Sequence, residues 1–384
     1  MKNTQLQLLQ ENLDEINEKI FEIKKEINVI DIAVTSQDVS KLLSTTFNVD
    51  KYKHLPHKIV LSSPTFTQGR IHGEQLTKLF GALSFTSPLS DRKCTSMKET
   101  HHKSTEAGFS PPVKQLLDQP ETVITIDTGY TDLYNVAYLG DNEIWTSGED
   151  KTMKLFSINQ RSLLKSITTK SGNVPYDIAV TKNGGLVYTD NSDRTVNIVG
   201  KEKIEVIRLR DWKPDSVCST SSGELLVIMN SIDDTQARVV RYFGLKEKQT
   251  IQFDDKGKPL YSPGPFYRYV TENRNKDICV SDDKNRAVVV VSQAGKLRFR
   301  YAGHTPAPKN QPFSPRGITT DSQSHILTAD FDNDCVHIID QDGQFHRYID
   351  CGLSEPNGLC TDTDDNLFVA QCETEQVKKI KYLQ

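Results

Sequence analysis

The feature that most constrains the fold is a pattern that recurs after 41 residues, counted from Pro315 to Pro356. One copy fills residues 317–340 and the next fills residues 358–380. Each copy contains three short runs of β-branched and aliphatic residues, separated by polar turns. A repeat of about 40 residues with about four strands is typical of a β-propeller blade. The chain is therefore predicted to be mainly β.

Weaker copies of the same pattern precede these two. They occupy residues 134–158, 175–198, 214–242 and 277–299. The pattern thus predicts a six-bladed propeller, with longer loops near 243–272 and 300–314, where proline and glycine are frequent. The last copy has no outer strand of its own, whereas the β-type run 121–126 precedes the first copy without a partner. We therefore predict that residues 121–126 complete the last blade and close the ring.

Residues 1–50 carry an amphipathic pattern of a different kind. Apolar residues follow one another at alternating spacings of three and four, which is the a/d register of a coiled coil. These positions are Leu6, Leu9, Leu13, Ile16, Ile20, Ile23, Ile27, Ile30 and Val34. Because a single exposed helix cannot cover this narrow stripe, we predict a coiled coil with another chain. A helix folded back on its own domain is the simpler alternative.

Residues 51–118 are predicted to be a largely irregular linker, and residues 119–384 to be the propeller. Proline, serine and threonine are dense in the linker, and disorder is expected over residues 84–108. Cys94, His101 and His102 lie in that stretch. Three potential ligands without a fourth are weak evidence for zinc. No metal and no cofactor is expected.

Composition and charge narrow the range of functions and locations. The net charge is −4, so no overall basic charge attracts the chain to nucleic acid or to a membrane. There is no apolar run of about 18 residues, and the first residues lack the apolar centre of a secretory signal. None of the seven cysteines forms a Cys-x-x-Cys pair, a pattern that fits reduced, buried thiols. A cytoplasmic protein is predicted.

Residues 317–338 read Gly-Ile…Asp…Ile-Leu-x-Ala-Asp-x-x-Asn-x-x-Val-x-Ile, a pattern that resembles the NHL repeat. The order of a heptad helix, a linker and six such repeats resembles the C-terminal part of tripartite-motif proteins with NHL repeats (TRIM-NHL). The resemblance covers the helix, residues 52–89 and the whole propeller. It implies an antiparallel coiled-coil dimer and a propeller face that recruits protein or RNA partners in ubiquitin-linked regulation.

Members of that family that act as ubiquitin ligases carry a RING finger and B-boxes before the helix. No such set of zinc ligands stands upstream of the helix here, so ligase activity is not carried over. The chain is predicted to be a non-enzyme. We expect a scaffold or adaptor that forms a homodimer, or a heterodimer with a longer relative.

The residues that directly follow the opening prolines are the candidates for partner contact. They are Tyr176, Asp215, Arg316 and Asn357. We expect them at one rim of the propeller channel, where their mixed chemistry suits a peptide or loop; ordinary loop residues are the simpler interpretation. From residue 121 onward acidic side chains outnumber basic ones, so a protein partner is favoured over RNA. An RNA-binding regulator is one alternative.

A calcium-dependent propeller hydrolase of the lactonase type is the other alternative. The run Pro356-Asn357-Gly358-Leu359 resembles one fragment of that pattern, in which the asparagine binds the metal. Asn357, Asp215 and Asp177 could offer oxygens to Ca²⁺, but no glutamate and no histidine base accompany them. The acidic stretch 330–334 lacks the glycine and the glutamate of an EF-hand loop. We predict a strand-joining turn there.

Overall fold

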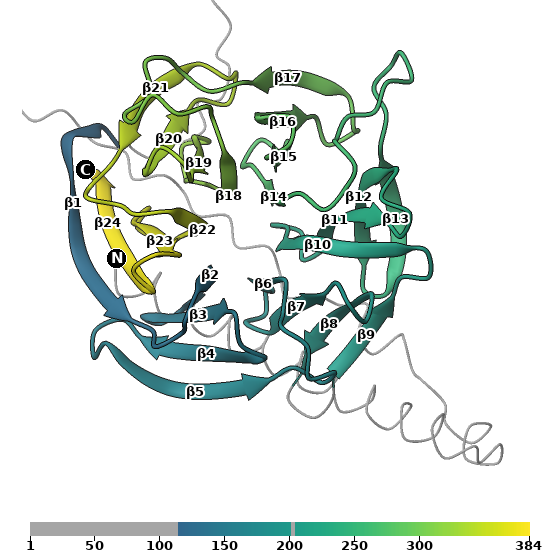
Figure 1. Cartoon of the computed structure of the whole chain (residues 1–384), viewed down its shortest axis with the longest axis horizontal. Helices are drawn as coiled ribbons and strands as arrows, with labels where there is room; N and C mark the ends of the chain where they lie inside the picture. Colours follow the sequence, from purple (N-terminus) through teal and green to yellow (C-terminus); the bar gives the residue numbers. More distant parts are fainter. Residues whose placement is uncertain (1–113, 201–203) are drawn as a thin grey trace, which may run out of the picture. The chain divides into compact units, whose positions relative to one another are not determined.

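The computed structural model describes residues 114–200 and 204–384. These residues form six four-stranded antiparallel sheets, arranged as blades around a central channel (Figure 1). The predicted six-bladed β-propeller is confirmed. The predicted coiled coil of residues 1–50 and most of the linker lie outside the described residues. Within the described residues, no helix is long and apolar enough to cross a bilayer.

Five of the blades are built from four consecutive strands, which run from the channel outward. Blade 1 contains β2 (Leu133–Gly140), β3 (Glu143–Gly148), β4 (Thr152–Ser157) and β5 (Ser162–Thr168), and blade 2 contains β6 (Asp177–Val180), β7 (Leu186–Asp190), β8 (Thr195–Val199) and β9 (Ile204–Arg208). Blade 3 contains β10 (Trp212–Ser219), β11 (Leu225–Ser231), β12 (Ala237–Phe243) and β13 (Lys246–Ile251). Blade 4 contains β14 (Arg268–Glu272), β15 (Ile278–Asp282), β16 (Ala287–Val291) and β17 (Leu297–Tyr301), and blade 5 contains β18 (Pro315–Thr320), β19 (Ile326–Asp330), β20 (Cys335–Ile339) and β21 (Phe345–Ile349).

Blade 6 draws its strands from both ends of the propeller. Three strands come from the C-terminal end: β22 (Pro356–Thr361), β23 (Leu367–Gln371) and β24 (Gln376–Leu383). The fourth is β1 (Leu116–Asp127), which pairs antiparallel with β24 from Leu116 opposite Leu383 to Asp127 opposite Gln376 (Figure 1). The predicted closure of the ring by residues 121–126 is therefore confirmed, and it leaves β24 with a paired outer edge.

The hydrophobic core lies between the blades. Each of the six pairs of neighbouring blades encloses one cluster of buried apolar side chains. The cluster between blades 6 and 1, for example, joins Ile126 of β1, Phe156 of β4 and Phe368 of β23. The aliphatic and β-branched residues of the middle strands fill these spaces, because both faces of a middle strand are covered by neighbouring blades.

Glycine allows the inner strands of neighbouring blades to approach one another closely. A Cβ atom at Gly317 would lie 2.2 Å from the carbonyl oxygen of Asn357 in blade 6. A Cβ atom at Gly358 would lie 2.6 Å from the Cα of Asn135 in blade 1. Neither contact is compatible with a side chain, so Gly317 and Gly358 allow the backbones of neighbouring blades to approach closely.

The structure corrects the boundaries of the fourth repeat. That repeat was predicted over residues 277–299, which omits the inner strand β14, and Arg268–Glu272 was assigned to a loop. The strand was missed because no proline directly opens it, and because a long connection after Ile251 separates it from blade 3. Strand β13 also falls inside the loop expected near 243–272, so only the connection between β13 and β14 remains irregular.

Aspartates end the second strands of blades 2, 4 and 5, and in two of these three blades they accept a hydrogen bond from the backbone of the following turn. Asp190 accepts from the backbone N–H of Asp193 at 2.8 Å, and Asp282 accepts from that of Asn285 at 3.2 Å. Asp330 instead accepts from the backbone N–H of Ser314, at 3.1 Å. The stretch 330–334 joins β19 to β20, which confirms the predicted turn.

Candidate functional site at the channel mouth

The channel mouth is the end of the ring at which the six inner strands begin. In each blade, one residue directly precedes the first residue that lines the channel. These six mouth residues are Tyr134, Tyr176, Asp215, Arg268, Arg316 and Asn357. The four rim residues named from the sequence thus occupy equivalent places at one end of the channel. Their role in binding stays a prediction.

Tyr134 and Arg268 are the mouth residues that the sequence analysis missed. The other four follow a proline, whereas Leu133 precedes Tyr134 and Tyr267 precedes Arg268. A second signal marks all six positions, because an aliphatic residue stands two places after each mouth residue. These aliphatic residues are Val136, Ile178, Val217, Val270, Ile318 and Leu359. Alignment on them instead of on the prolines would have located the two missing residues.

A buried ion pair joins blades 3 and 4 at the mouth. The Nε and Nη2 atoms of Arg268 donate to Oδ2 of Asp215 at 2.9 and 2.5 Å. The guanidinium also donates to the carbonyl oxygens of Ser262 and Gly264, at 2.6 and 2.9 Å. The Arg268 side chain is 0% exposed and that of Asp215 is 4% exposed, so the guanidinium is held inside the mouth. Its hydrogen bonds offset the cost of burying the charge.

Tyr269 connects blade 4 to blade 6. Its hydroxyl donates a 2.8 Å hydrogen bond to Oδ1 of Asn357, and both residues are buried. The rim position of blade 6 is therefore fixed by a side chain from across the ring. Two of the four sequence-predicted rim residues, Asp215 and Asn357, are thus held by protein partners rather than presented to solvent.

The other two, Tyr176 and Arg316, meet at Tyr267. The rings of Tyr176 and Tyr267 stack with centroids 6.5 Å apart and planes inclined by 20°. The Arg316 guanidinium lies 3.8 Å from the centre of the Tyr267 ring and 4.9 Å from that of Phe331. Its Nε and Nη1 atoms are buried without a hydrogen-bond partner, and the carboxylate of Asp283 is 3.8 Å away. Tyr267 itself is 42% exposed.

A cavity of about 560 Å³ opens beside this stack. We call it the tyrosine pocket, because Tyr134, Tyr176, Tyr267 and Tyr269 line it together with Glu149. Burial, followed by the charges of nearby carboxylates, raises the pKa of Tyr134 to about 12, so this phenol is neutral at physiological pH. The pocket combines aromatic walls with a few polar groups, which is typical of ligand sites.

The residues suggested as calcium ligands do not fit a bound cation. Asp177, Asp215 and Asn357 all lie at or just inside the mouth. Asp215 is held by Arg268, however, and Asn357 by the hydroxyl of Tyr269. Asp177 accepts two backbone N–H hydrogen bonds, at 2.8 and 3.0 Å. Calcium takes six to eight oxygens, and a buried guanidinium next to one of the few carboxylates would repel it.

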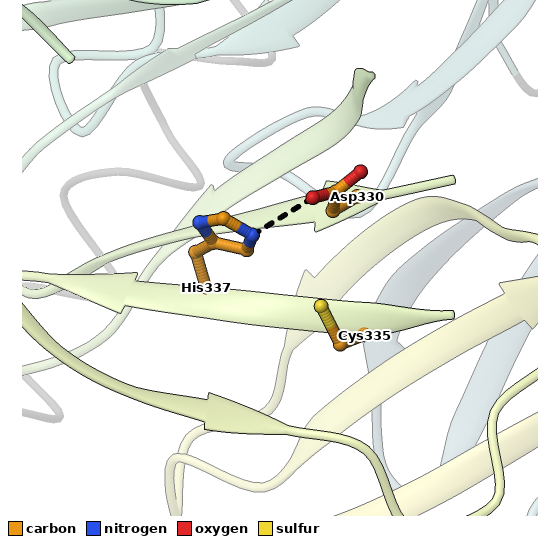
Figure 2. Close-up of side chains that lie close together, drawn as sticks. All are labelled: Asp330, Cys335 and His337. Carbon is orange, nitrogen blue, oxygen red and sulfur yellow. Dashed lines mark hydrogen bonds and ion pairs between the residues drawn. The ribbon is translucent and has the colours of Figure 1, made fainter. Parts of the chain in front are cut away.

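A second cluster of potential metal ligands lies inside blade 5, where Asp330, Cys335 and His337 come together (Figure 2). His337 is hydrogen-bonded through both ring nitrogens, at 3.0 Å to Asp330 and at 2.8 Å to the hydroxyl of Tyr301. Burial lowers the pKa of His337 and raises that of the Cys335 thiol, so both groups are uncharged near pH 7. Because both ring nitrogens of His337 are already hydrogen-bonded, this arrangement fits a buried hydrogen-bonded network better than a metal centre.

Comparison with solved structures bears on the fold. A gluconolactonase from Xanthomonas campestris is 13% identical over 72% of this chain and 98% of its own, with a TM-score of 0.53. A protein of unknown function from Bacteroides thetaiotaomicron is 15% identical over 69% and 76%, also with a TM-score of 0.53. Virginiamycin B lyase from Staphylococcus aureus is 12% identical over 70% and 99%, with a TM-score of 0.48. The likenesses to the gluconolactonase and to the Bacteroides protein show a shared propeller fold.

No protein-family model matches the chain. No curated protein matches it either. The structure itself establishes the six-bladed propeller. Membership of the TRIM-NHL family stays a prediction from the sequence.

The gluconolactonase corrects the expectation that this chain is not an enzyme. That expectation rests on the missing RING and on treating the propeller only as a platform for partners. That reasoning is wrong, because a solved propeller of the same fold, the gluconolactonase, is itself an enzyme. Among the functions considered from the sequence, a lactonase-type hydrolase is the one that matches the activity of a structural neighbour. No comparison supports a scaffold. The function must therefore be argued from the site.

Proposed function

We propose that the channel mouth recognises a ligand, and that this ligand is a segment of a protein partner. One observation carries the proposal: Tyr267 stands half-exposed at the mouth and contacts both Tyr176 and Arg316. Three blades thus contribute two tyrosine rings and an arginine to one surface beside an open cavity. Tyrosine and arginine are the residue types most often found at the energetic centres of protein interfaces. The proposal concerns binding and leaves catalysis open to the test below.

The charges of the mouth favour a protein over RNA. Arg268 is neutralised by Asp215, and Arg316 lies within 3.8 Å of Asp283. RNA binding depends on basic side chains that are free to contact phosphates. The two arginines of the mouth are paired with carboxylates, and acidic residues outnumber basic ones in the propeller. The mouth therefore offers few basic side chains to phosphates.

The TRIM-NHL resemblance extends the proposal beyond the propeller. A coiled coil over residues 1–50 would place two propellers in one dimer and make partner binding bivalent. We propose on this basis an adaptor role in ubiquitin-linked regulation. Co-precipitation of two differently tagged copies tests the dimer, and replacing Ile20 and Ile23 by Asp should abolish it. Unchanged co-precipitation would show that the coiled coil does not hold the two copies together.

Partner capture by the full chain tests recognition at the mouth. The double variant Tyr176→Ala and Arg316→Ala should lose the partners that the unmodified chain retains. A matched control removes an aromatic ring and a cation elsewhere on the propeller, Phe243 and Lys248, whose ring centre and Nζ lie 4.9 Å apart. The control variant should keep its partners. Equal retention by both variants would show that the mouth is not the binding surface.

A lactonase-type hydrolase is the second candidate, because the fold is shared with a gluconolactonase. The positions of Arg268 and Tyr269 argue against a calcium ion at Asp215 and Asn357. We therefore expect no calcium-dependent rise in melting temperature and no calcium-dependent hydrolysis of a gluconolactone by the full chain. A rise in melting temperature that saturates with calcium, together with lactone hydrolysis, would establish this candidate instead.

A further inference from the structure

We propose that the tyrosine pocket receives a basic side chain, lysine or arginine, from the partner segment. This assignment rests on the proposed function, since it names the group by which the mouth would recognise that segment. It depends on the chemistry of the pocket walls, on the charge at the rim and on the neighbourhood of Arg316.

Aromatic rings form most of the pocket wall. Tyr134, Tyr176 and Tyr267 come from the starts of the inner strands of blades 1, 2 and 4, so rings from three blades converge on one cavity. The face of a tyrosine ring carries partial negative charge and attracts a cation placed within about 6 Å of its centre. Several rings around one cavity can contact the same cation, which is the arrangement by which proteins hold ammonium groups.

The charge at the rim of the pocket is negative. Glu149 is the charged side chain among the residues that line the pocket. Its backbone N–H donates to the carbonyl oxygen of Asp132 at 2.9 Å, so a second acidic residue is its direct neighbour. A hydrogen bond to Asp132 and the charge of that residue raise the pKa of Glu149. A cation that enters the pocket would relieve this repulsion between carboxylates.

The nearby Arg316 is not among the residues that line the pocket. It lines a separate cavity on the side of blades 4 and 5, together with Asp283, Asp332, Lys284 and Arg286. The guanidinium lies over Tyr267 at 3.8 Å, which shows that this ring already accepts a cation against its face. The partner's cation would use the rings on the side of blades 1 and 2, where the carboxylates of Asp132 and Glu149 lie.

The full chain can be titrated with Nα-acetyl-lysinamide, and with Nα-acetyl-norleucinamide as the uncharged analogue of the same length, at constant ionic strength. Binding is followed by NMR of ¹³C-labelled tyrosine rings. The lysine compound should bind at least about fivefold more tightly than the norleucine compound and should shift the signals of Tyr134, Tyr176 and Tyr267. Equal affinity for the two compounds, or shifts confined to other tyrosines, would overturn the assignment.

Two variants separate the aromatic and the ionic contributions. Tyr134→Ala should weaken binding of Nα-acetyl-lysinamide several-fold. Glu149→Gln should weaken it without any effect on folding, because Glu149 is exposed. The matched control is Glu143→Gln, at the start of strand β3, whose last residue directly precedes Glu149, and it should bind normally. Unchanged binding in Glu149→Gln, or an equal loss in Glu143→Gln, would contradict the pocket.

The pocket and the proposed function can fail independently. If Nα-acetyl-lysinamide does not bind while the Tyr176 and Arg316 double variant still loses its partner, the pocket assignment is wrong and the function stands. If Nα-acetyl-lysinamide binds while that variant keeps every partner, the function is wrong and the pocket remains a cation site.

Discussion

Arg268 donates two hydrogen bonds to a single carboxylate oxygen of Asp215, and the side chains of both residues are almost completely buried. The pair joins blade 4 to blade 3 at the channel mouth. Burial raises the pKa of Asp215 to about 6 against the opposing effect of Arg268. The carboxylate therefore remains ionised at neutral pH and is matched by a guanidinium that cannot lose its proton.

Removing only the arginine should be costly. In Arg268→Met the Asp215 carboxylate stays buried without its partner, and the free energy of unfolding should fall by about 3–5 kcal/mol. Adding Asp215→Asn should restore part of this loss, because no unpaired charge remains. Urea denaturation of the full chain measures both variants. As a control, Lys213→Met removes a pair that is partly exposed, and it should cost less than about 1 kcal/mol. Equal losses for Arg268→Met and Lys213→Met would contradict this view of the mouth.

Close approach of blades 5 and 6 should make Gly317 sensitive to a single methyl group. Gly317→Ala would place Cβ 2.2 Å from a backbone oxygen of blade 6. The inner strands of blades 5 and 6 would have to move apart, which should lower the free energy of unfolding by about 1–3 kcal/mol or more. Gly185→Ala is the matched control, since its Cβ would lie 3.0 Å from the side-chain oxygen of Thr181 and at an ordinary contact distance of 3.6 Å from the nearest backbone atom, the oxygen of Val199. Thermal unfolding should show a clearly lower melting temperature for Gly317→Ala than for Gly185→Ala. The reverse order would mean that the inner strands are not packed as described.

The carboxyl group of Asp177 should make stability fall as pH rises from about 4 to about 6. Burial raises the pKa of Asp177 from 3.8 to about 6 in the folded chain. Between these values the folded state keeps a proton that the unfolded state releases, so the free energy of unfolding decreases with pH, by up to about 3 kcal/mol in total. Above about pH 6 the Asp177 carboxyl is ionised in the folded state as well, and the full loss of stability is present.

Asp177→Asn isolates this effect, because the amide does not titrate. As pH rises through this window, the free energy of unfolding of the unmodified chain should fall relative to that of the variant. Urea denaturation at several values between about pH 4 and pH 7 measures it. A difference that stays constant over this range would show that Asp177 is not the buried acid described.

The repeat was sufficient to predict the architecture, because each blade satisfies local rules of strand and turn sequence. Pro315 and Pro356 set the period, and Gly317 and Gly358 stand where backbones must approach closely. Ring closure could be predicted for a physical reason, since an unpaired strand near one end and a missing strand at the other satisfy each other.

The connections across the mouth could not be predicted in the same way. The contacts of Arg268 with Asp215 and of Tyr269 with Asn357 join residues 53 and 88 positions apart. Such contacts depend on where the blades bring their inner strands together, which no local pattern encodes. In blades 1 and 4 no proline precedes the mouth residue, so the sequence analysis missed Tyr134 and Arg268.

Removal of the closing strand should destabilise the whole ring. A chain that begins at Asp132 lacks β1, so the outer edge of β24 is exposed and Ile126 leaves the core between blades 6 and 1. We expect this chain to be insoluble or to unfold at a much lower temperature than one that begins at Lys114. Solubility on expression and circular dichroism melting measure the difference. Normal folding of the shorter chain would disprove the role of β1.

Site-specific crosslinking from the pocket tests the central claim most directly. The photoreactive residue p-benzoylphenylalanine can replace Ser192, which lines the tyrosine pocket, or Leu164, which is 46% exposed on the outer strand of blade 1. Crosslinked products from cell extract, with and without RNase, are then identified by mass spectrometry. We predict RNase-resistant crosslinks to a protein from position 192, absent from position 164 and lost on Tyr176→Ala. Crosslinks of equal strength from both positions, or a signal that disappears with RNase, would contradict recognition of a protein at the channel mouth.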